Sequence, residues 1–346
     1  MDEFSQLKED IADIIKNYKR NELWFELNSK HVDKWIRQFE EDEQLIVLRE
    51  TFNLLNNNYM DKKKVKAYFN EIWNCSGIMG DNPEEELDDI QFLNIQRKGT
   101  SQSSLIELLE KTYLKEHDVN INKKNHSGIK KYIYIDDCMY TGQTVRNDIK
   151  YWIDNCEPNC NTELILVFLG LFTGNLDYKQ KEIEQICADR NIQVKFFSEI
   201  TYNNNIYSTD ESYDFLWPEK IEGNEYVDAY IEELENERSV KSKKGLDFRT
   251  WIDNNNNTFT SIEDRRVFEQ ALLKAGAYIV SLPANRNPRI RPMGFSSSIS
   301  LGFGAFFATY LNISNNCPLA FWWGDPWKDK TDTLGKWYPL LPREVN

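Results

Sequence analysis

Two neighbouring aspartates and a threonine–glycine loop are the residues of this 346-residue chain whose types and spacing point most clearly to chemistry. The apolar run 132–135 is followed by Asp136 and Asp137 and, after three further residues, by the sequence Thr-Gly-Gln-Thr. Adjacent carboxylates repel each other, so burying both without a partner is costly. The vicinal hydroxyls of a ribose, or a Mg²⁺ ion bound to them, are suitable partners. We therefore expect the two aspartates to face such a ligand.

The loop after the aspartates has the composition of an anion site. Gly142 permits a backbone conformation that turns N–H groups inward, and Thr141 and Thr144 flank Gly142 and Gln143 with hydroxyl donors. A helix predicted over about 143–154 would direct the positive end of its dipole at the same point. These donors suit the 5-phosphate of a ribose. The alternative interpretation is an ordinary strand-to-helix turn with good capping residues.

A basic turn follows an earlier apolar run. Residues 90–95 read as a short strand, and Arg97, Lys98 and Gly99 come directly after it. Two cations beside a glycine suit an anionic ligand, because the cations supply charge and the glycine supplies backbone freedom. A solvated basic turn is the alternative.

Alternating strands and helices are predicted to position these residues. Apolar runs predict strands at 90–95, 132–135, 163–169 and 192–197, with helices between them at 101–113, 143–154 and 178–190. This alternation is typical of an α/β fold with a parallel sheet and crossover helices. Such sheets bind ligands at the carboxyl ends of their strands, which is where Asp136 and Asp137 are expected.

The rest of the chain suggests two further regions. Apolar residues at helical spacing predict an N-terminal helical region over 1–85, followed by the α/β core over 86–215. Residues 216–346 are predicted to form a C-terminal α+β extension that packs on the core, because its many aromatic residues need a partner surface.

Two clusters in this extension have alternative interpretations. Three arginines lie close together, at Arg286, Arg289 and Arg291. They would either bind phosphate or pair with acidic groups of the same chain. Three tryptophans would either stack a base or pack in a core or interface. They are Trp322, Trp323 and Trp327.

Composition restricts the class of protein. A formal net charge of -14 argues against a surface that binds nucleic acid directly, although it leaves room for a local basic pocket. Six cysteines without a CxxC pair predict reduced thiols. We expect the acidic start MDEFSQLKED not to be a signal peptide, and the longest apolar stretch, 299–311, is too short to span a bilayer. We expect a cytoplasmic protein without a membrane segment.

The run YIYIDDCMYTGQTV at 132–145 resembles the phosphoribosyl pyrophosphate (PRPP) signature of the type I phosphoribosyltransferases. That signature consists of four mostly apolar strand residues, two acidic residues, a short variable stretch and a Thr-Gly-x-Thr loop. The resemblance implies that Asp136 and Asp137 are catalytic, bind the ribose and hold Mg²⁺ through its hydroxyls. It implies that the 5-phosphate is held by Thr141, Gly142, Gln143 and Thr144.

The same resemblance assigns a role to the basic turn. In that family the first core strand ends in a loop that binds pyrophosphate, and Arg97, Lys98 and Gly99 match it in position. The family also carries a long mobile loop before the signature strand, which closes over the active site. Only residues 114–130 are available for it here, with three candidate side chains at Lys123, Lys124 and His126. We therefore expect ligand binding to be better supported than transfer.

A wider resemblance links the whole chain to phosphoribosyltransferase-like proteins of bacterial conflict and anti-phage systems. The features that carry it are HVDKW at 31–35, RKGTSQSS at 97–104, and RPMGF with NNCPLAFWW near the end. It implies a component of a defence system, with a partner protein encoded nearby or a second copy of the chain as partner. Three functions stay open: an enzyme that uses PRPP with Mg²⁺, a non-catalytic nucleotide sensor, and a structural subunit.

Overall fold

The computed structural model describes residues 2–19, 22–97, 99–121, 128–205, 213–241, 248–250 and 258–345. The chain folds as two compact units. Residues 62–208 form one of them, which we call the sheet unit. Residues 1–61 and 209–346 together form the other, which we call the helical unit.

The sheet unit is built around four parallel strands in the order β2-β3-β4-β5. The strands are β2 (Ile90–Leu93), β3 (Lys131–Met139), β4 (Glu163–Phe172) and β5 (Gln193–Tyr202). The helices are α4 (Lys62–Trp73), α5 (Ser76–Met79), α6 (Pro83–Glu86), α7 (Ser101–His117), α8 (Gln143–Cys156) and α9 (Leu176–Cys187), with short 3-10 turns at Leu87–Asp89 and Ala188–Arg190. The predicted α/β fold with a parallel sheet is confirmed.

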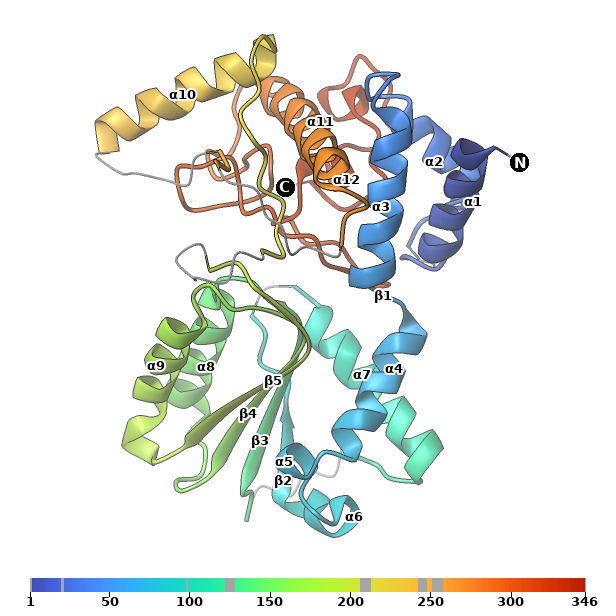
Figure 1. Cartoon of the computed structure of the whole chain (residues 1–346). Helices are drawn as coiled ribbons and strands as arrows, with labels where there is room; N and C mark the ends of the chain where they lie inside the picture. Colours follow the sequence, from blue (N-terminus) through green and yellow to red (C-terminus); the bar gives the residue numbers. More distant parts are fainter. Residues whose placement is uncertain are drawn as a thin grey trace. The chain divides into compact units, whose positions relative to one another are not determined.

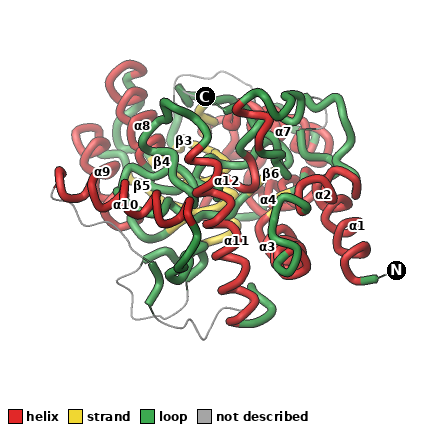
Figure 2. The backbone as a smooth tube through the Cα atoms, turned by 90° about the horizontal axis from the view of Figure 1, so that it is seen from above, coloured by secondary structure: helices red, strands yellow, loops and turns green. Residues whose placement is uncertain are grey.

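Helices cover both faces of this sheet. Figure 1 and Figure 2 show α8 and α9 on one face and α4 and α7 on the other. Every residue of β4 after Glu163 is buried, as expected for a strand enclosed on both sides. The strands follow one another in sequence order, so crossovers of one hand would place all connecting helices on one face. Because α7 lies opposite α8 and α9, the β2-to-β3 crossover has the opposite hand to the next two.

The helical unit joins the two ends of the chain in one core. Its elements are α1 (Glu3–Ile15), α2 (Ser29–Ile36), α3 (Gln44–Asn58), β1 (Tyr59–Met60), α10 (Glu225–Lys241), α11 (Ile262–Ser281), β6 (Ala308–Thr309), α12 (Leu319–Trp322) and a 3-10 turn at Thr333–Lys336. β1 and β6 pair in parallel. Buried side chains from the N-terminal helices, α11, α12 and the C-terminal segment form one apolar cluster.

Polar contacts fix this union of the two chain ends. The indole N–H of Trp35 donates to the carbonyl of Ala320 (2.9 Å), and the Tyr18 hydroxyl donates to the carbonyl of Pro342 (3.0 Å). His31 is buried against the carbonyl of Leu340 (2.8 Å), and burial lowers the pKa of this imidazole to about 4. The C-terminal segment is therefore the packing partner of the first three helices.

The two units differ from the three regions predicted over 1–85, 86–215 and 216–346. α4 to α6 belong to the sheet unit, whereas α1 to α3 share a core with the C-terminal segment. The physical reason is that each N-terminal helix has a single apolar stripe, and the aromatic residues near the C-terminus supply the surface that buries it. Sequence spacing alone does not show which distant segment provides that surface.

The arginine and tryptophan clusters serve mainly the fold of the helical unit. Arg286 forms an ion pair with Glu233, and Arg291 pairs with Glu237 at 2.9 Å. Arg289 is exposed. The two tryptophans at 322 and 323 are buried in the core, whereas Trp327 is 42% exposed and its ring stacks on that of Trp24. Pairing within the chain and core packing thus account for most of both clusters.

Two general features complete the description. All six cysteines are free, and three of them, Cys138, Cys187 and Cys317, are buried. Among the described residues, no helix combines the length and the apolar character needed to cross a bilayer.

Candidate functional site

The two aspartates lie at the carboxyl end of β3, which continues to Met139. Asp136 is only 5% exposed, and Asp137 is half-buried. Burial raises the pKa of both carboxyls above the ordinary value of 3.8, and the neighbouring charge of Asp136 raises the pKa of Asp137 further. The fold therefore places two carboxylates in a poorly solvated position, and the raised pKa of Asp137 favours its protonated form.

Asp136 is fully engaged by donors from the protein. One of its oxygens accepts from the Ser101 hydroxyl (2.8 Å) and from the backbone N–H of Asp137 (2.9 Å). The other accepts from the Tyr134 hydroxyl (3.2 Å) and the Gln96 side-chain amide (3.3 Å). Four donors saturate its lone pairs. Asp136 therefore ties β3 to the loop after β2 and to the first turn of α7.

Asp137 is engaged much less. One of its oxygens accepts from the backbone N–H of Cys138 (2.7 Å). Beyond this bond, its hydrogen-bonding neighbours in the described part of the chain are its own backbone N–H and the carboxyl of Asp136. Of the pair, Asp137 is thus the carboxylate with an oxygen available to a ligand.

A third carboxylate, Asp148 of α8, lies close to this pair. It is buried, and burial raises its pKa. Its two oxygens lie 3.4 Å from the Tyr134 hydroxyl and 3.4 Å from the backbone nitrogen of Arg97. Tyr134 has one hydroxyl proton for two carboxylates, Asp136 and Asp148. Burial raises the pKa of both acids, and the nearby charge of Arg97 opposes this rise at Asp148.

The loop after β2 is held by Gln102, a buried residue in the first turn of α7. Its side-chain oxygen accepts from the backbone N–H groups of Ile95 (2.6 Å) and Gln96 (2.8 Å). Its side-chain amide donates to the carbonyl of Ile135 (3.2 Å), the residue before Asp136. Gln102 thus fixes this loop relative to the aspartates.

The Thr-Gly-Gln-Thr loop meets α8 at Gly142. Gly142 is the N-cap of the helix with φ +70°, a left-handed conformation that favours glycine. Among the described residues, the first backbone N–H of this turn that finds a partner is that of Arg146, which donates to the carbonyl of Gly142 (2.9 Å). The N–H groups of residues 143–145 are therefore the free donors of a helix N-terminus, which is the arrangement that binds phosphate.

A cation from α9 stands beside this loop. A Cβ atom added at Gly142 would lie 2.9 Å from Cγ of Lys179, so the lysine stem packs directly against the glycine. The Lys179 ammonium donates to the side-chain oxygen of Gln143 (3.0 Å) and pairs with Glu182 (2.6 Å). Arg146 lies 3.8 Å from the same glutamate. The anion site thus has nearby positive charge as well as backbone donors.

The remaining predicted residues are placed as follows. Thr141 is half-buried in the loop, whereas Gln143 and Thr144 are exposed in the first turn of α8. The Arg97 side chain is exposed, with its guanidinium 4.7 Å from the ring centre of Tyr151. Gly99 has φ +93°. Lys98 lies outside the described residues, as do the three candidate side chains Lys123, Lys124 and His126.

Sequence reasoning missed the residues that support the site. They are Gln96, Ser101, Gln102, Tyr134, Asp148 and Lys179. Ser101 and Gln102 follow the basic turn directly, so a search for side chains that pin that turn would have found them. No local signal marks Lys179, because it reaches the loop only through the packing of α9 beside α8.

This arrangement defines a class of protein. A parallel sheet with an aspartate pair at one strand end, a glycine loop opening a helix, and a second loop beside them has the architecture of the phosphoribosyltransferases. The chain belongs to the PRTase-CE family, a phosphoribosyltransferase-type family whose sequence model matches residues 32–343. Neither a curated protein nor a solved structure matches the chain. The family match extends over both units, so the helical unit is part of what defines the family.

Proposed function

We propose that the sheet unit binds the ribose 5-phosphate of PRPP or of a nucleotide. The observation that carries this proposal is the meeting of Asp137, the free N–H groups of α8 and the loop pinned by Gln102 at one edge of a parallel sheet. Phosphate suits the helix N-terminus and the nearby Lys179 ammonium. Ribose hydroxyls suit the available oxygen of Asp137, since they donate hydrogen bonds that relieve a buried carboxylate.

The two aspartates have different roles in this proposal. Asp137 contacts the ribose, because it retains an acceptor oxygen. Asp136 acts as a positioning residue, because its four protein donors leave no acceptor for a ligand. Its bonds to Ser101 and Gln96 hold the loop after β2 beside the aspartate pair.

Mg²⁺ fits this site as an ion that arrives with the ligand. In the described part of the chain, no three His, Cys, Asp or Glu side chains gather into a metal site. Mg²⁺ usually keeps several waters and takes one or two carboxylates together with substrate oxygens. Asp137 would supply such a carboxylate, next to the ribose hydroxyls. When bound, the ion would neutralise charge on a leaving diphosphate.

Transfer chemistry needs more than binding. An enzyme of this type would hold the ribose at Asp137 and stabilise the departing diphosphate with Arg97 and Lys98. The Arg97 guanidinium lies over Tyr151 instead of pairing with a described carboxylate, so it is free to turn toward an anion. A nucleotide sensor is the second candidate. It is favoured by the short segment 114–130, which leaves little chain to cover the reaction centre.

We also propose that the protein serves a bacterial anti-phage defence system, with a neighbouring gene product or a second copy of the chain as partner. This proposal rests on the sequence resemblance described above. Light scattering of the chain alone and with the products of neighbouring genes would measure both kinds of assembly. Absence of any complex, together with unchanged phage resistance after deletion of the gene, would contradict the proposal.

Isothermal titration calorimetry with PRPP and Mg²⁺ tests the binding site. We expect binding by the parent chain and a loss of at least tenfold in affinity for Asp137→Asn, with no loss for Asp189→Asn, an exposed aspartate elsewhere in the sheet unit. Equal binding by Asp137→Asn and the parent would sink the site assignment. Incubation of PRPP with bases and nucleotides then separates the two candidates, since pyrophosphate release supports an enzyme and binding without products supports a sensor.

A further inference from the structure

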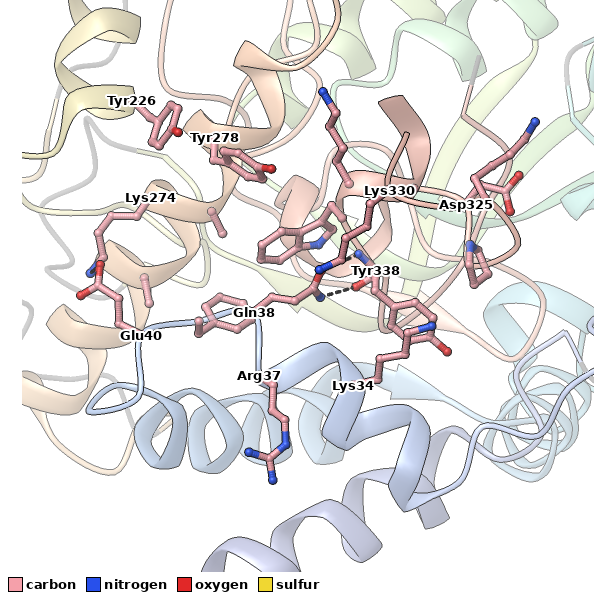
Figure 3. A pocket seen from close by; sticks show the side chains of 18 of the residues that line it. Lys34, Arg37, Gln38, Glu40, Tyr226, Lys274, Tyr278, Asp325, Lys330 and Tyr338 are labelled. Atoms are coloured by element: carbon pink, nitrogen blue, oxygen red, sulfur yellow. Dashed lines mark hydrogen bonds and ion pairs between the residues drawn. The ribbon is translucent and has the colours of Figure 1, made fainter. Parts of the chain in front are cut away.

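The helical unit contains a pocket of its own, with a volume of about 820 Å³. It is bordered by the end of α2 and the turn after it, by the start of α10, by α11, and by the segment 325–338 (Figure 3). Its volume lies in the range of about 300–1,000 Å³ that is usual for small-molecule sites. Nothing in the proposed function of the sheet unit makes use of it.

The charge of this pocket is opposite to that of the chain. Six basic and four acidic residues line it, whereas the chain as a whole has a formal net charge of -14. The acidic residues are already engaged. Glu40 and Glu43 both pair with Lys274, at 2.8 and 2.6 Å. Asp325 and Asp329 accept from backbone N–H groups of their own loop, those of Trp327 and Thr331.

Three lysines in the pocket have no carboxylate partner. Lys34, Lys330 and Lys336 form no ion pair with any acidic group in the described part of the chain. Lys34 instead lies over the ring of Tyr338, 4.0 Å from its centre. Unpaired cations attract anions, and a bound anion would relieve the repulsion among them, so their gathering on one pocket gives that pocket an anion preference.

The segment that carries two of these lysines is held in a defined shape. The backbone N–H of Asp325 donates to the carbonyl of Leu334 (2.8 Å), which closes the segment on itself. Gly335 packs directly against the carbonyl of Asp329, leaving no room for a side chain. Lys330 and Lys336 therefore lie on a loop whose backbone conformation is fixed by contacts within the loop.

Aromatic rings line the opposite side of the pocket. Figure 3 shows Tyr226 and Tyr278 on one side and Lys34, Lys330 and Asp325 on the other. The two tyrosine rings meet edge to face with centres 5.2 Å apart, and Tyr226 is 37% exposed. Rings that are accessible in this way offer a surface for stacking or edge contacts with a flat ligand.

We infer that this pocket is a second ligand site, and that it binds a nucleoside phosphate. The phosphate would lie against Lys330, Lys336 and Lys34, and the base against Tyr226 and Tyr278. A ligand that contacts both the cationic and the aromatic side needs two chemically different ends. Inorganic phosphate would satisfy only the lysines, and a free nucleoside would satisfy only the tyrosines.

Calorimetric titration of the full chain with adenosine 5′-monophosphate tests this inference. All variants are made in the Asp137→Asn background, which removes the proposed ribose contact of the sheet unit. We expect Lys330→Glu/Lys336→Glu to weaken binding at least tenfold. The matched control Lys16→Glu/Lys30→Glu makes the same charge change elsewhere on the helical unit and should bind as the background does. The milder Lys330→Gln/Lys336→Gln should show a smaller loss in the same direction.

Further titrations separate the two ends of the ligand. Tyr226→Ala should weaken binding of the nucleotide and leave binding of inorganic phosphate unchanged. The inference is overturned if the background chain does not bind the nucleotide, or if the lysine double variants bind as well as the control. If inorganic phosphate binds as tightly as the nucleotide, the assignment of a nucleoside phosphate as the ligand is overturned. Failure of the sheet-unit site would show as equal affinity with and without Asp137→Asn, independently of these outcomes.

Discussion

Replacing Asp137 by Asn should make the protein more stable at pH 8 while weakening its binding of PRPP at least tenfold. Burial and the adjacent Asp136 raise the pKa of Asp137 above its ordinary value of 3.8. The folded chain therefore holds a proton more tightly than the unfolded chain does. Stability then falls as pH rises from about 4 toward the raised pKa, because the folded state must give up that proton. An asparagine carries no charge and removes this loss.

The size of the effect follows from the geometry. One pKa unit corresponds to about 1.4 kcal/mol, and two carboxylates that share a buried position raise the second pKa by at least about one unit. The asparagine side-chain oxygen can still accept the Cys138 N–H, so that hydrogen bond is kept. We therefore expect a net stabilisation of about 1–2 kcal/mol at pH 8, or roughly 2–8 °C in the midpoint of thermal unfolding.

Thermal unfolding followed by circular dichroism at pH 8 and pH 4.5 would check this. The gain should be present at pH 8 and shrink strongly at pH 4.5, where the parent carboxyl is protonated as well. Asp136→Asn is the internal comparison and should destabilise at both values, because it turns an amide toward the donors of Ser101 and Tyr134. A loss of stability for Asp137→Asn at pH 8, or a gain that does not depend on pH, would refute the reasoning.

Two further substitutions test the phosphate loop and the core of the helical unit. Gly142→Ala forces an alanine into φ +70° and brings its Cβ to 2.9 Å from the Lys179 stem. We therefore expect a cost of about 1–2 kcal/mol in stability and a loss of at least tenfold in PRPP affinity by calorimetry. Unchanged affinity would mean that the loop does not hold the phosphate. Glu269→Ala removes the carboxylate that pairs with the buried guanidinium groups of Arg249 (3.2 Å) and Arg265 (3.0 Å), although Arg249 keeps its ion pair with Glu219 (3.0 Å). Denaturant unfolding should therefore show a loss of about 3–5 kcal/mol, and a loss below 1 kcal/mol would contradict this account.

The sequence by itself determined the sheet and the loops that border its site. Long apolar runs such as ELILVFL at 163–169 predict buried parallel strands, because a strand covered on both faces is apolar at every position. The order strand, Asp136-Asp137, loop, helix is likewise local, since residues a few positions apart decide where the strand ends and where α8 begins. These features need only short-range geometry, which residue type and spacing encode directly.

The tertiary structure alone decided how these residues are used. It joined α1 to α3 with the C-terminal segment and brought Lys179 beside Gly142. It also surrounded the carboxylate of Asp136 with protein donors, whereas Asp137 kept an oxygen for a ligand. Apart from the local bonds from Tyr134 and the Asp137 N–H to Asp136 and from the Cys138 N–H to Asp137, these pairings link residues far apart in the chain. Their partners are chosen by side-chain packing across the whole core, which a local pattern does not specify. For that reason the spacing identified the aspartate pair, but only the packed structure distinguished its two members.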